Sequence, residues 1–352
     1  MDLNFKKNRK KIKICYWNVH GVKSQIIGDK LLDQEFLGKL RNSDIVSLSE
    51  LHTEKEDIFL PGYRLLKQKI RKKVHKGPKI GGGIAVFVRE DFCDLIHVVP
   101  NTNENSIWIR IKKGSEEGGD VFIGSYYVSP ETKKSKHNLF DILNEEAKQF
   151  RDRGEVIIQG DFNARTGQRE DFIRTDRFFE NIFDGFPADT RVLPPRNSED
   201  GVSNARGEEL LDFCKTNEFA IVNGRKVGDI FGRCTSHQYN GSSAIDYLLT
   251  TTEGFSKVSS FEVGDYVPWL SDHSPIFADV GVNVRQREPG APIALHGRDQ
   301  GYMWDDECEG RFKALLLGTS DRLETADLSV RPVCLHDTFT ETIDEVLISQ
   351  PK

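Results

Sequence analysis

The sequence predicts an α+β fold in which two packed, mostly antiparallel β-sheets are flanked by helices, giving a sandwich of four layers. Short strand-like apolar runs are scattered from residue 12 to residue 282, whereas only two stretches have a helical stripe of apolar residues. One run, Ile107–Lys112, alternates apolar and polar residues as a half-exposed strand does. Many strands with few helices favour two sheets packed face to face with the helices outside.

The predicted elements follow from these patterns. The helices are Asn138–Phe150 and Glu208–Lys215, where apolar residues recur at helical spacing. The predicted strands are Ile12–Trp17, Ile45–Leu48, Gly83–Val88, Ile107–Lys112, Val121–Val128, Val156–Gln159, Phe219–Val222, Ala244–Thr250 and Pro275–Val282.

The chain of 352 residues has no uninterrupted apolar run of bilayer-spanning length, so we expect a soluble intracellular protein without a membrane partner. None of its six cysteines forms a CxxC pair, which argues against a disulfide framework or a zinc site. A glycine- and proline-containing stretch follows the last strand. We therefore expect a basic arm at 1–11, one domain at 12–284 and an acidic, linker-like extension at 285–352.

The net charge of −6 argues at first against a nucleic-acid partner, but its distribution weakens that objection. Residues 285–352 carry 8 basic and 13 acidic side chains, which leaves 41 basic and 42 acidic ones in the remainder. Eight Lys and Arg side chains without an acidic one lie between Arg64 and Lys79. Such a cluster can follow a phosphate backbone, and a solvated loop without a ligand is an equally good interpretation.

Polar side chains stand where the apolar strands end, and strand ends are rigid platforms for a site. Asn18, Glu50 and Asp161 each follow an apolar run, and Asp272 and His273 precede one. Each has an ordinary alternative as a turn residue or a surface carboxylate. Asp246 lies within an apolar run, where an unpaired carboxylate is costly, and His273 is its natural partner.

Taken in order, these residues resemble the endonuclease/exonuclease/phosphatase superfamily, which includes apurinic endonucleases, pancreatic-type deoxyribonucleases, inositol polyphosphate phosphatases and neutral sphingomyelinases. The resemblance covers roughly residues 12–282 and implies a deoxyribonuclease-like fold. Six short motifs in family order carry it: Tyr16–Gly21, Ser49–Thr53, Tyr127–Pro130, Gly160–Ala164, Ile245–Tyr247 and Ser271–Ser274.

Within this superfamily, several short segments resemble the apurinic-like endonuclease domains of non-LTR retrotransposons, notably Gly160–Gly167, Asn204–Gly207 and Gly81–Gly83. In such elements a reverse transcriptase follows the nuclease, so a reverse transcriptase region of a parent polyprotein is an expected partner. Two departures stand out. His20 replaces the aspartate of apurinic endonucleases, which weakens any transfer of abasic-site specificity. Ala244 stands where many relatives carry a basic residue.

The resemblance implies a magnesium-dependent phosphodiesterase that nicks DNA and leaves a 3′-hydroxyl and a 5′-phosphate, with Mn²⁺ as a substitute metal. Glu50 would be the principal metal ligand, with Asn18 beside it and Asp272 sharing the metal. Asp161, aided by Asn163, would orient or deprotonate the attacking water. The remaining catalytic roles fall to His273 at the phosphate, Asp246 as its orienting partner, and Tyr127 at the phosphate or the leaving group.

DNA contacts are expected from basic side chains outside this set: Arg71, Lys72, Lys73, Arg225, Lys226 and Arg233. Ordinary surface charge is the alternative for each. Two other functions of the whole chain stay open. One is a phosphatase or lipid phosphodiesterase of the same fold, and the other is a non-catalytic remnant that binds nucleic acid. The basic N-terminus favours a nuclear location, with the cytoplasm as the alternative. The sequence leaves the oligomeric state open.

Overall fold

The computed structural model describes residues 8–70, 81–112, 119–129, 139–173 and 193–285. These all fall in the first of two units into which the chain divides, Met1–Ala291 and Pro292–Lys352. Residues 286–352 of the predicted extension and residues 1–7 of the predicted basic arm lie outside the described residues. The rest of the arm, from Asn8, belongs to a strand that pairs with the strand ending at Arg285. The domain boundaries stay predictions. Within the described part, no helix is long and apolar enough to cross a membrane.

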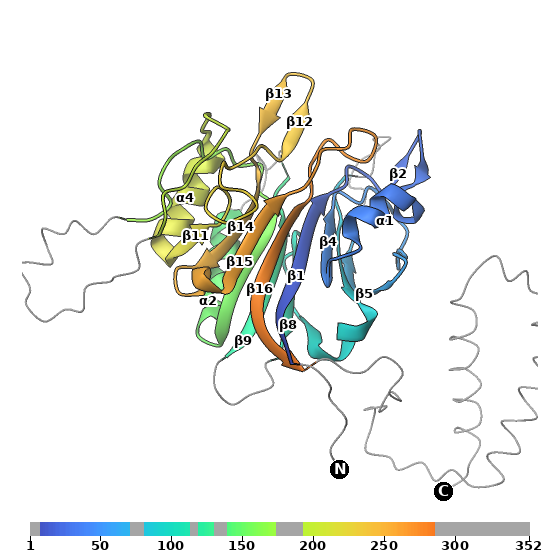
Figure 1. Cartoon of the computed structure of the whole chain (residues 1–352), viewed down its shortest axis with the longest axis horizontal. Helices are drawn as coiled ribbons and strands as arrows, with labels where there is room; N and C mark the ends of the chain where they lie inside the picture. The colour runs from blue at the N-terminus through green and yellow to red at the C-terminus, as the bar shows by residue number, and fades with distance from the viewer. Residues whose placement is uncertain (1–7, 71–80, 113–118, 130–138, 174–192, 286–352) are drawn as a thin grey trace, which may run out of the picture. The chain divides into compact units, whose positions relative to one another are not determined.

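Two six-stranded sheets form the centre of the molecule (Figure 1). The first sheet has the order β15 (Val258–Val263), β16 (Ile276–Arg285), β1 (Asn8–Asn18), β4 (Ile45–Ser49), β6 (Ile84–Arg89) and β5 (Tyr63–Lys69). The second has the order β11 (Phe219–Ile221), β14 (Asp246–Thr251), β10 (Gly154–Asp161), β9 (Asp120–Tyr127), β8 (Ser106–Ile111) and β7 (Ile96–Val99).

The two sheets share one pairing pattern. In the first, β1 pairs parallel with β4, and β16 and β6 flank that pair antiparallel. In the second, β10 pairs parallel with β9, and β14 and β8 flank that pair antiparallel. All other pairings are antiparallel, which confirms the predicted mostly antiparallel sheets. In each sheet, therefore, two central strands end and a flanking strand begins at the same end of the sheet, the edge formed by strand ends and not by an outermost strand.

Three buried clusters separate four layers and confirm the predicted sandwich. Along β1, Ile12, Ile14 and Tyr16 belong to the core between the sheets, while Cys15 and Trp17 belong to the cluster on the outer face. Because both faces of this strand are buried from Ile14 to Trp17, that part of its sequence is apolar without alternation. The outer cluster of the first sheet is completed by α1 (Gln34–Leu40), and α2 (Leu139–Arg151) and α4 (Ala205–Asn217) cover the second sheet.

The predicted elements exist, and most boundaries shift by only a few residues. The helix predicted from Glu208 begins at Ala205, because the Asn204 side chain accepts a hydrogen bond from Gly207 N at 2.8 Å and caps the helix. The strand predicted from Ala244 begins at Asp246. The four cysteines among the described residues are free, as expected.

Several elements escaped prediction. Strand β5 carries the basic residues Arg64, Lys67 and Lys69 at exposed or partly exposed positions, β7 has four residues, and α1 has seven. Three strands at or next to sheet edges, β5, β7 and β15, lack a continuous apolar run because one face meets solvent. Two hairpins also form, β2 (Lys23–Ser24) with β3 (Gly28–Asp29), and β12 (Ser236–Gln238) with β13 (Gly241–Ser243). The second projects beyond the sheet edge in Figure 1. Among the described residues, 3₁₀ helices also form at Lys30–Leu32, Glu90–Leu95 and Gly254–Lys257.

Candidate active site

The strand ends of both sheets place the predicted catalytic residues together. Asn18 ends β1 and Asp161 ends β10, and the Asn18 amide donates to Asp161 Oδ2 at 2.9 Å, joining the two sheets. A second hydrogen bond also joins the two sheets. The hydroxyl of Tyr127, at the end of β9, donates to Oε1 of Glu50, which follows β4, at 2.6 Å. The neighbouring strand β14 begins at Asp246, which pairs in register with Asp161. The shared topology of the sheets thus produces one polar centre.

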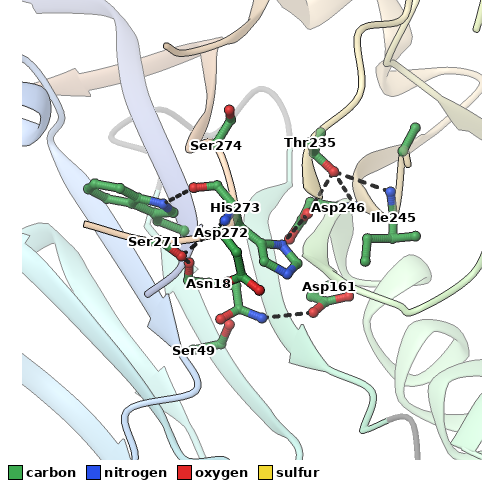
Figure 2. Close-up of polar contacts among 12 residues, drawn as sticks. Asn18, Ser49, Asp161, Thr235, Ile245, Asp246, Ser271, Asp272, His273 and Ser274 are labelled. Atoms are coloured by element: carbon green, nitrogen blue, oxygen red, sulfur yellow. Dashed lines mark hydrogen bonds and ion pairs between the residues drawn. The ribbon is translucent and has the colours of Figure 1, made fainter. Parts of the chain in front are cut away.

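A buried histidine–carboxylate pair lies at this centre. His273 Nδ1 is 2.8 Å from Asp246 Oδ2, and the two side chains are 7% and 1% exposed. Thr235 Oγ donates to the same carboxylate oxygen at 2.7 Å. Figure 2 shows the His273 imidazole between Asp246 and Asp161. The costly buried carboxylate predicted from the sequence is therefore paired with the histidine that the sequence indicated.

The charges of this pair set the protonation states around it. Burial lowers the pKa of His273, but the charge of Asp246 and the hydrogen bond to it outweigh burial and raise that pKa to about 10. His273 is consequently an imidazolium at neutral pH. Burial and the neighbouring charge of Asp246 raise the pKa of Asp161, with His273 partly opposing them. A carboxylate with a raised pKa is suited to accepting a proton near neutral pH.

Glu50 is held in an unusual backbone conformation. Its φ is 51°, in the left-handed region that few residues other than glycine adopt. Hydrogen bonds from Gly21 N to Glu50 O at 2.6 Å and from Val19 N to Ser49 O at 3.0 Å hold its loop against the loop after β1. Such strain is found where the surrounding structure fixes a functional side chain. The conformation turns Glu50 out of the strand direction and toward Tyr127.

The Glu50 side chain is ionised and accessible. Burial raises its pKa, but hydrogen bonds from His52, Tyr127 and Asn18 outweigh burial and lower the pKa to about 2. The side chain is 15% exposed. Asp272 is similar, because burial raises its pKa while hydrogen bonding and attraction from His20 lower it. Its side chain is 28% exposed. Two ionised carboxylates thus reach solvent at the same edge.

The site contains two sets of donors for a divalent cation. Asp161, Asp246 and His273 have donor atoms within 4.8 Å of one another. A protonated histidine cannot be a ligand, and the raised pKa of His273 argues against this set. Glu50, Asp272 and the Asn18 amide oxygen are the second set. The carboxylates of Glu50 and Asp272 are ionised and partly exposed, and the Asn18 amide oxygen is neutral and buried. Such hard oxygen donors fit Mg²⁺, which keeps several of its waters. This second set is the one predicted from the sequence.

Known proteins resemble this chain in sequence family and in fold. Residues 121–277 match the family model described as endonuclease-reverse transcriptase. The predicted resemblance is confirmed. No curated protein matches the chain.

Two solved structures share the fold of this chain with TM-scores above 0.5, and a third is also similar. The AP endonuclease LMAP from Leishmania major is 12% identical, with a TM-score of 0.52 over 77% of this chain and 88% of that one. The catalytic domain of Xenopus laevis APE2 is 16% identical, with a TM-score of 0.51 over 80% and 94%. The endonuclease domain of TRAS1, a telomere-specific non-LTR retrotransposon, is 16% identical, with a TM-score of 0.46 over 78% and 100%.

Several residues that support the candidate site were missed by the sequence analysis. Trp17 Nε1 donates to His273 O at 2.7 Å, and Ser271 Oγ donates to Asn18 O at 2.7 Å, so both fix the His273 segment to β1. Thr235 fixes Asp246. Trp17 and Ser271 lie within two of the family motifs, and only that position could have indicated a role for them. No sequence pattern around Thr235 indicates one. His52 Nε2, 3.4 Å from Glu50 Oε2, was inside a quoted motif but received no role.

Asn163 acts on Asp161 mainly through its backbone. Its N–H donates to Asp161 Oδ1 at 2.9 Å, and its side-chain amide donates to Val128 O at 2.9 Å. Its φ of 49° is tolerated by asparagine better than by most residues. Asn163 therefore orients the Asp161 carboxylate.

The predicted DNA-contacting residues have different surroundings. Arg71, Lys72 and Lys73 lie outside the described residues. Arg225 is buried, with its guanidinium bound to Asp171 through Nη1 at 2.6 Å and Nη2 at 2.7 Å. This burial argues against a phosphate contact by Arg225 and favours a structural role. Lys226 Nζ donates to Phe255 O at 2.8 Å, while Arg233 donates to Val263 O and remains 40% exposed.

Proposed function

We propose that this protein is a metal-dependent DNA endonuclease that nicks a strand by hydrolysing a phosphodiester bond and leaves a 3′-hydroxyl and a 5′-phosphate. The observation that carries the proposal is the joining of the His273–Asp246 pair, Asp161 and Glu50 at one edge of both sheets. Phosphodiester hydrolysis needs a positioned water, stabilised charge on the phosphate and stabilised charge on the leaving oxygen, which then takes its proton from solvent. These side chains, together with the cation that they would hold, can meet each need.

In the proposed hydrolysis, each of three side chains has a separate role. His273, an imidazolium fixed by Asp246, donates a hydrogen bond to a phosphate oxygen through its free edge. Asp161, with its raised pKa, orients the attacking water and accepts its proton. Asn163 keeps the Asp161 carboxylate in place.

A divalent cation, Mg²⁺ in this proposal, would be held by Glu50, Asp272 and Asn18. It would stabilise negative charge on the phosphate and on the leaving oxygen. Tyr127 donates to Glu50, which favours a positioning role for it over the direct phosphate contact expected from the sequence.

The β12–β13 hairpin supports a nucleic-acid substrate. It is anchored on the site segment, since His237 N donates to Asp272 O at 2.7 Å and His237 Nε2 is 3.2 Å from Ser274 Oγ. Tyr239 at its tip is fully exposed. An exposed aromatic ring beside a phosphodiesterase centre can stack on a base or enter a groove. The family match at 121–277 supports the same substrate class and a reverse transcriptase in a parent polyprotein.

Nicking of supercoiled plasmid with Mg²⁺ tests the proposal. We expect relaxed circles whose ends can be extended by a polymerase, which requires a free 3′-hydroxyl. EDTA and Glu50→Gln, which keeps the side-chain shape, should both abolish nicking. Absence of nicking by folded protein supplied with Mg²⁺ would overturn the proposal. Hydrolysis of small phosphomonoesters or lipid phosphodiesters in its place would favour the alternative enzymes of this fold. The nuclear location expected from the basic N-terminus stays a prediction.

A further inference from the structure

A small cavity lies beside Asp272, on the side of the site where the cation would bind. Its volume is about 260 Å³. Pockets that enclose a whole drug-sized ligand have roughly 300–1,000 Å³, so this one can hold a single ring system of a larger substrate. The region after β1 and the segment before β16 form its walls, with the side chains of His20, Lys30, Pro268, Trp269, Leu270 and Asp272.

Trp269 is the aromatic wall of this cavity. Its side chain is 45% exposed, although tryptophan is on average a well-buried residue. The residues around it are anchored, since Val267 and Leu270 are buried in the outer cluster of the first sheet. Leu270 N also donates to Val267 O at 2.9 Å and closes a turn. The structure therefore presents a fixed, partly exposed indole, which is a suitable face for stacking on a flat ring.

The rest of the cavity is equally well fixed. Lys30 is buried, and its Nζ donates to Val19 O at 2.7 Å and to His20 O at 3.4 Å. On the other wall, Ser271 Oγ donates to Asn18 O at 2.7 Å. Both walls are thus fastened to the end of β1 and its following loop, so a ligand would enter a preformed cavity at little cost in ordering.

The geometry of hydrolysis decides which part of a DNA strand lies on this side. In phosphoryl transfer the attacking and leaving oxygens are roughly in line, on opposite sides of phosphorus. In the proposed function Asp161 positions the attacking water, and the cation held by Glu50 and Asp272 stabilises the leaving 3′-oxygen. The nucleotide that carries the leaving oxygen therefore extends past Asp272, toward the cavity.

We infer that this cavity receives the base of the nucleotide on the 5′ side of the cut, and that Trp269 stacks on that base and helps to select the cut position. The inference rests on the proposed function and adds a base contact to it. To reach Trp269 the base must leave its stack, and this costs least where the base is weakly stacked or unpaired. Cuts should therefore favour such positions.

The competing explanation is that Trp269 only fastens α1 to the segment before β16. Its Nε1 donates to Glu35 Oε2 at 3.0 Å. Three variants separate the two roles. Trp269→Phe keeps an aromatic face and loses the hydrogen bond, whereas Glu35→Ala keeps the indole and loses the same hydrogen bond. Trp269→Ser loses both.

The test uses the full chain with Mg²⁺ and duplex oligonucleotides that contain a nick position mapped on plasmid. One duplex is intact, one lacks the base of the nucleotide on the 5′ side of the cut, and one lacks the base on the 3′ side. Product length reports kcat/KM for cleavage of the mapped bond. Phe59→Ser is the matched control, because Phe59 is similarly exposed at 47%. Circular dichroism and the Mg²⁺ concentration for half-maximal nicking check the fold and the cation site.

We expect removal of the 5′ base to lower kcat/KM of wild type about 5- to 100-fold. Trp269→Ser should lose a similar factor on the intact duplex and nothing more on the duplex without that base. Its Mg²⁺ dependence should be unchanged, and its nick positions on plasmid should shift. Trp269→Phe, Glu35→Ala and Phe59→Ser should stay near wild type. Removal of the 3′ base should affect wild type and Trp269→Ser by the same factor.

Three results would overturn the inference. They are a wild type indifferent to the 5′ base, losses from Trp269→Ser and base removal that multiply, and a Trp269→Phe variant as impaired as Trp269→Ser. The first result decides the matter even if Trp269→Ser does not fold. In each case continued nicking by wild type leaves the proposed function intact, whereas folded wild type that cuts neither plasmid nor duplex would overturn both.

Discussion

The His273 imidazole and the Asp246 carboxylate form a buried pair whose Nδ1 and Oδ2 atoms are 2.8 Å apart. The pair joins the segment before β16 in the first sheet to the start of β14 in the second. Since each group sets the protonation and orientation of the other, the two should act as one unit.

Removing either member of this pair should cost about as much nicking as removing both. We expect His273→Asn and Asp246→Asn each to lower the maximal rate about 10²- to 10⁴-fold. The double variant should fall by the same factor, because the second substitution removes a residue that has lost its partner. Single-turnover nicking at saturating Mg²⁺ measures the rates. A double variant whose loss equals the product of the single losses would contradict this coupling.

The same pair should make stability depend on pH. The folded pKa of His273 is raised to about 10 from an ordinary 6.5. Its contribution to stability is therefore complete below pH 6.5 and is lost as pH rises through 10. In EDTA, the urea midpoint of wild type should fall across this window. The double variant Asp246→Asn/His273→Asn lacks both groups, so its urea midpoint should fall less over the same pH range. If the midpoints of wild type and the double variant fell in parallel, the pair would not be the main source of the pH dependence of stability.

Tyr127→Phe should weaken metal binding more than chemistry. The change removes the 2.6 Å hydrogen bond that helps hold Glu50 in its ionised form. We expect the Mg²⁺ concentration for half-maximal nicking to rise about tenfold, with a near-normal rate at saturating metal. Tyr266→Phe, at a partly exposed tyrosine, is the control. A large loss that excess Mg²⁺ does not restore would instead support direct contact of Tyr127 with the phosphate or leaving group.

Arg225 should be needed for folding and not for DNA contact. Its side chain is 1% exposed and its partner Asp171 is 0% exposed. Asp171→Asn should lower the free energy of unfolding by about 3–5 kcal/mol, because it leaves a buried charge without its partner. Arg225→Met should be comparably damaging. Chemical denaturation measures both. Normal stability of Arg225→Met combined with weakened DNA binding would restore the role expected from the sequence.

The hairpin tip should influence where DNA is cut. Tyr239 is exposed at the end of the β12–β13 hairpin, so Tyr239→Ser removes no internal packing. Because base stacking contributes about 1–3 kcal/mol, we expect DNA affinity to fall about 5- to 100-fold, with altered nick positions. Phe59→Ser, at another exposed aromatic residue, should leave both unchanged. An unchanged nick map for Tyr239→Ser would exclude the tip from target selection.

The sequence by itself determined the sandwich architecture and the membership of the polar centre. Continuous apolar runs mark the central strands because those strands are buried on both faces, and polar residues at their ends are visible along the chain. The pairing of Asp246 with His273 was also predictable, since a buried carboxylate requires a partner.

Only the tertiary structure decided the surroundings of these residues. The edge strand β5 and the strained φ of Glu50 depend on neighbours distant in sequence. Arg225 and Arg233 look alike along the chain, yet burial against Asp171 separates them. The pKa shifts of His273 and Asp161 likewise arise from three-dimensional proximity. Residue type determines which chemistry is available, whereas burial and distance determine which groups are charged and where they act.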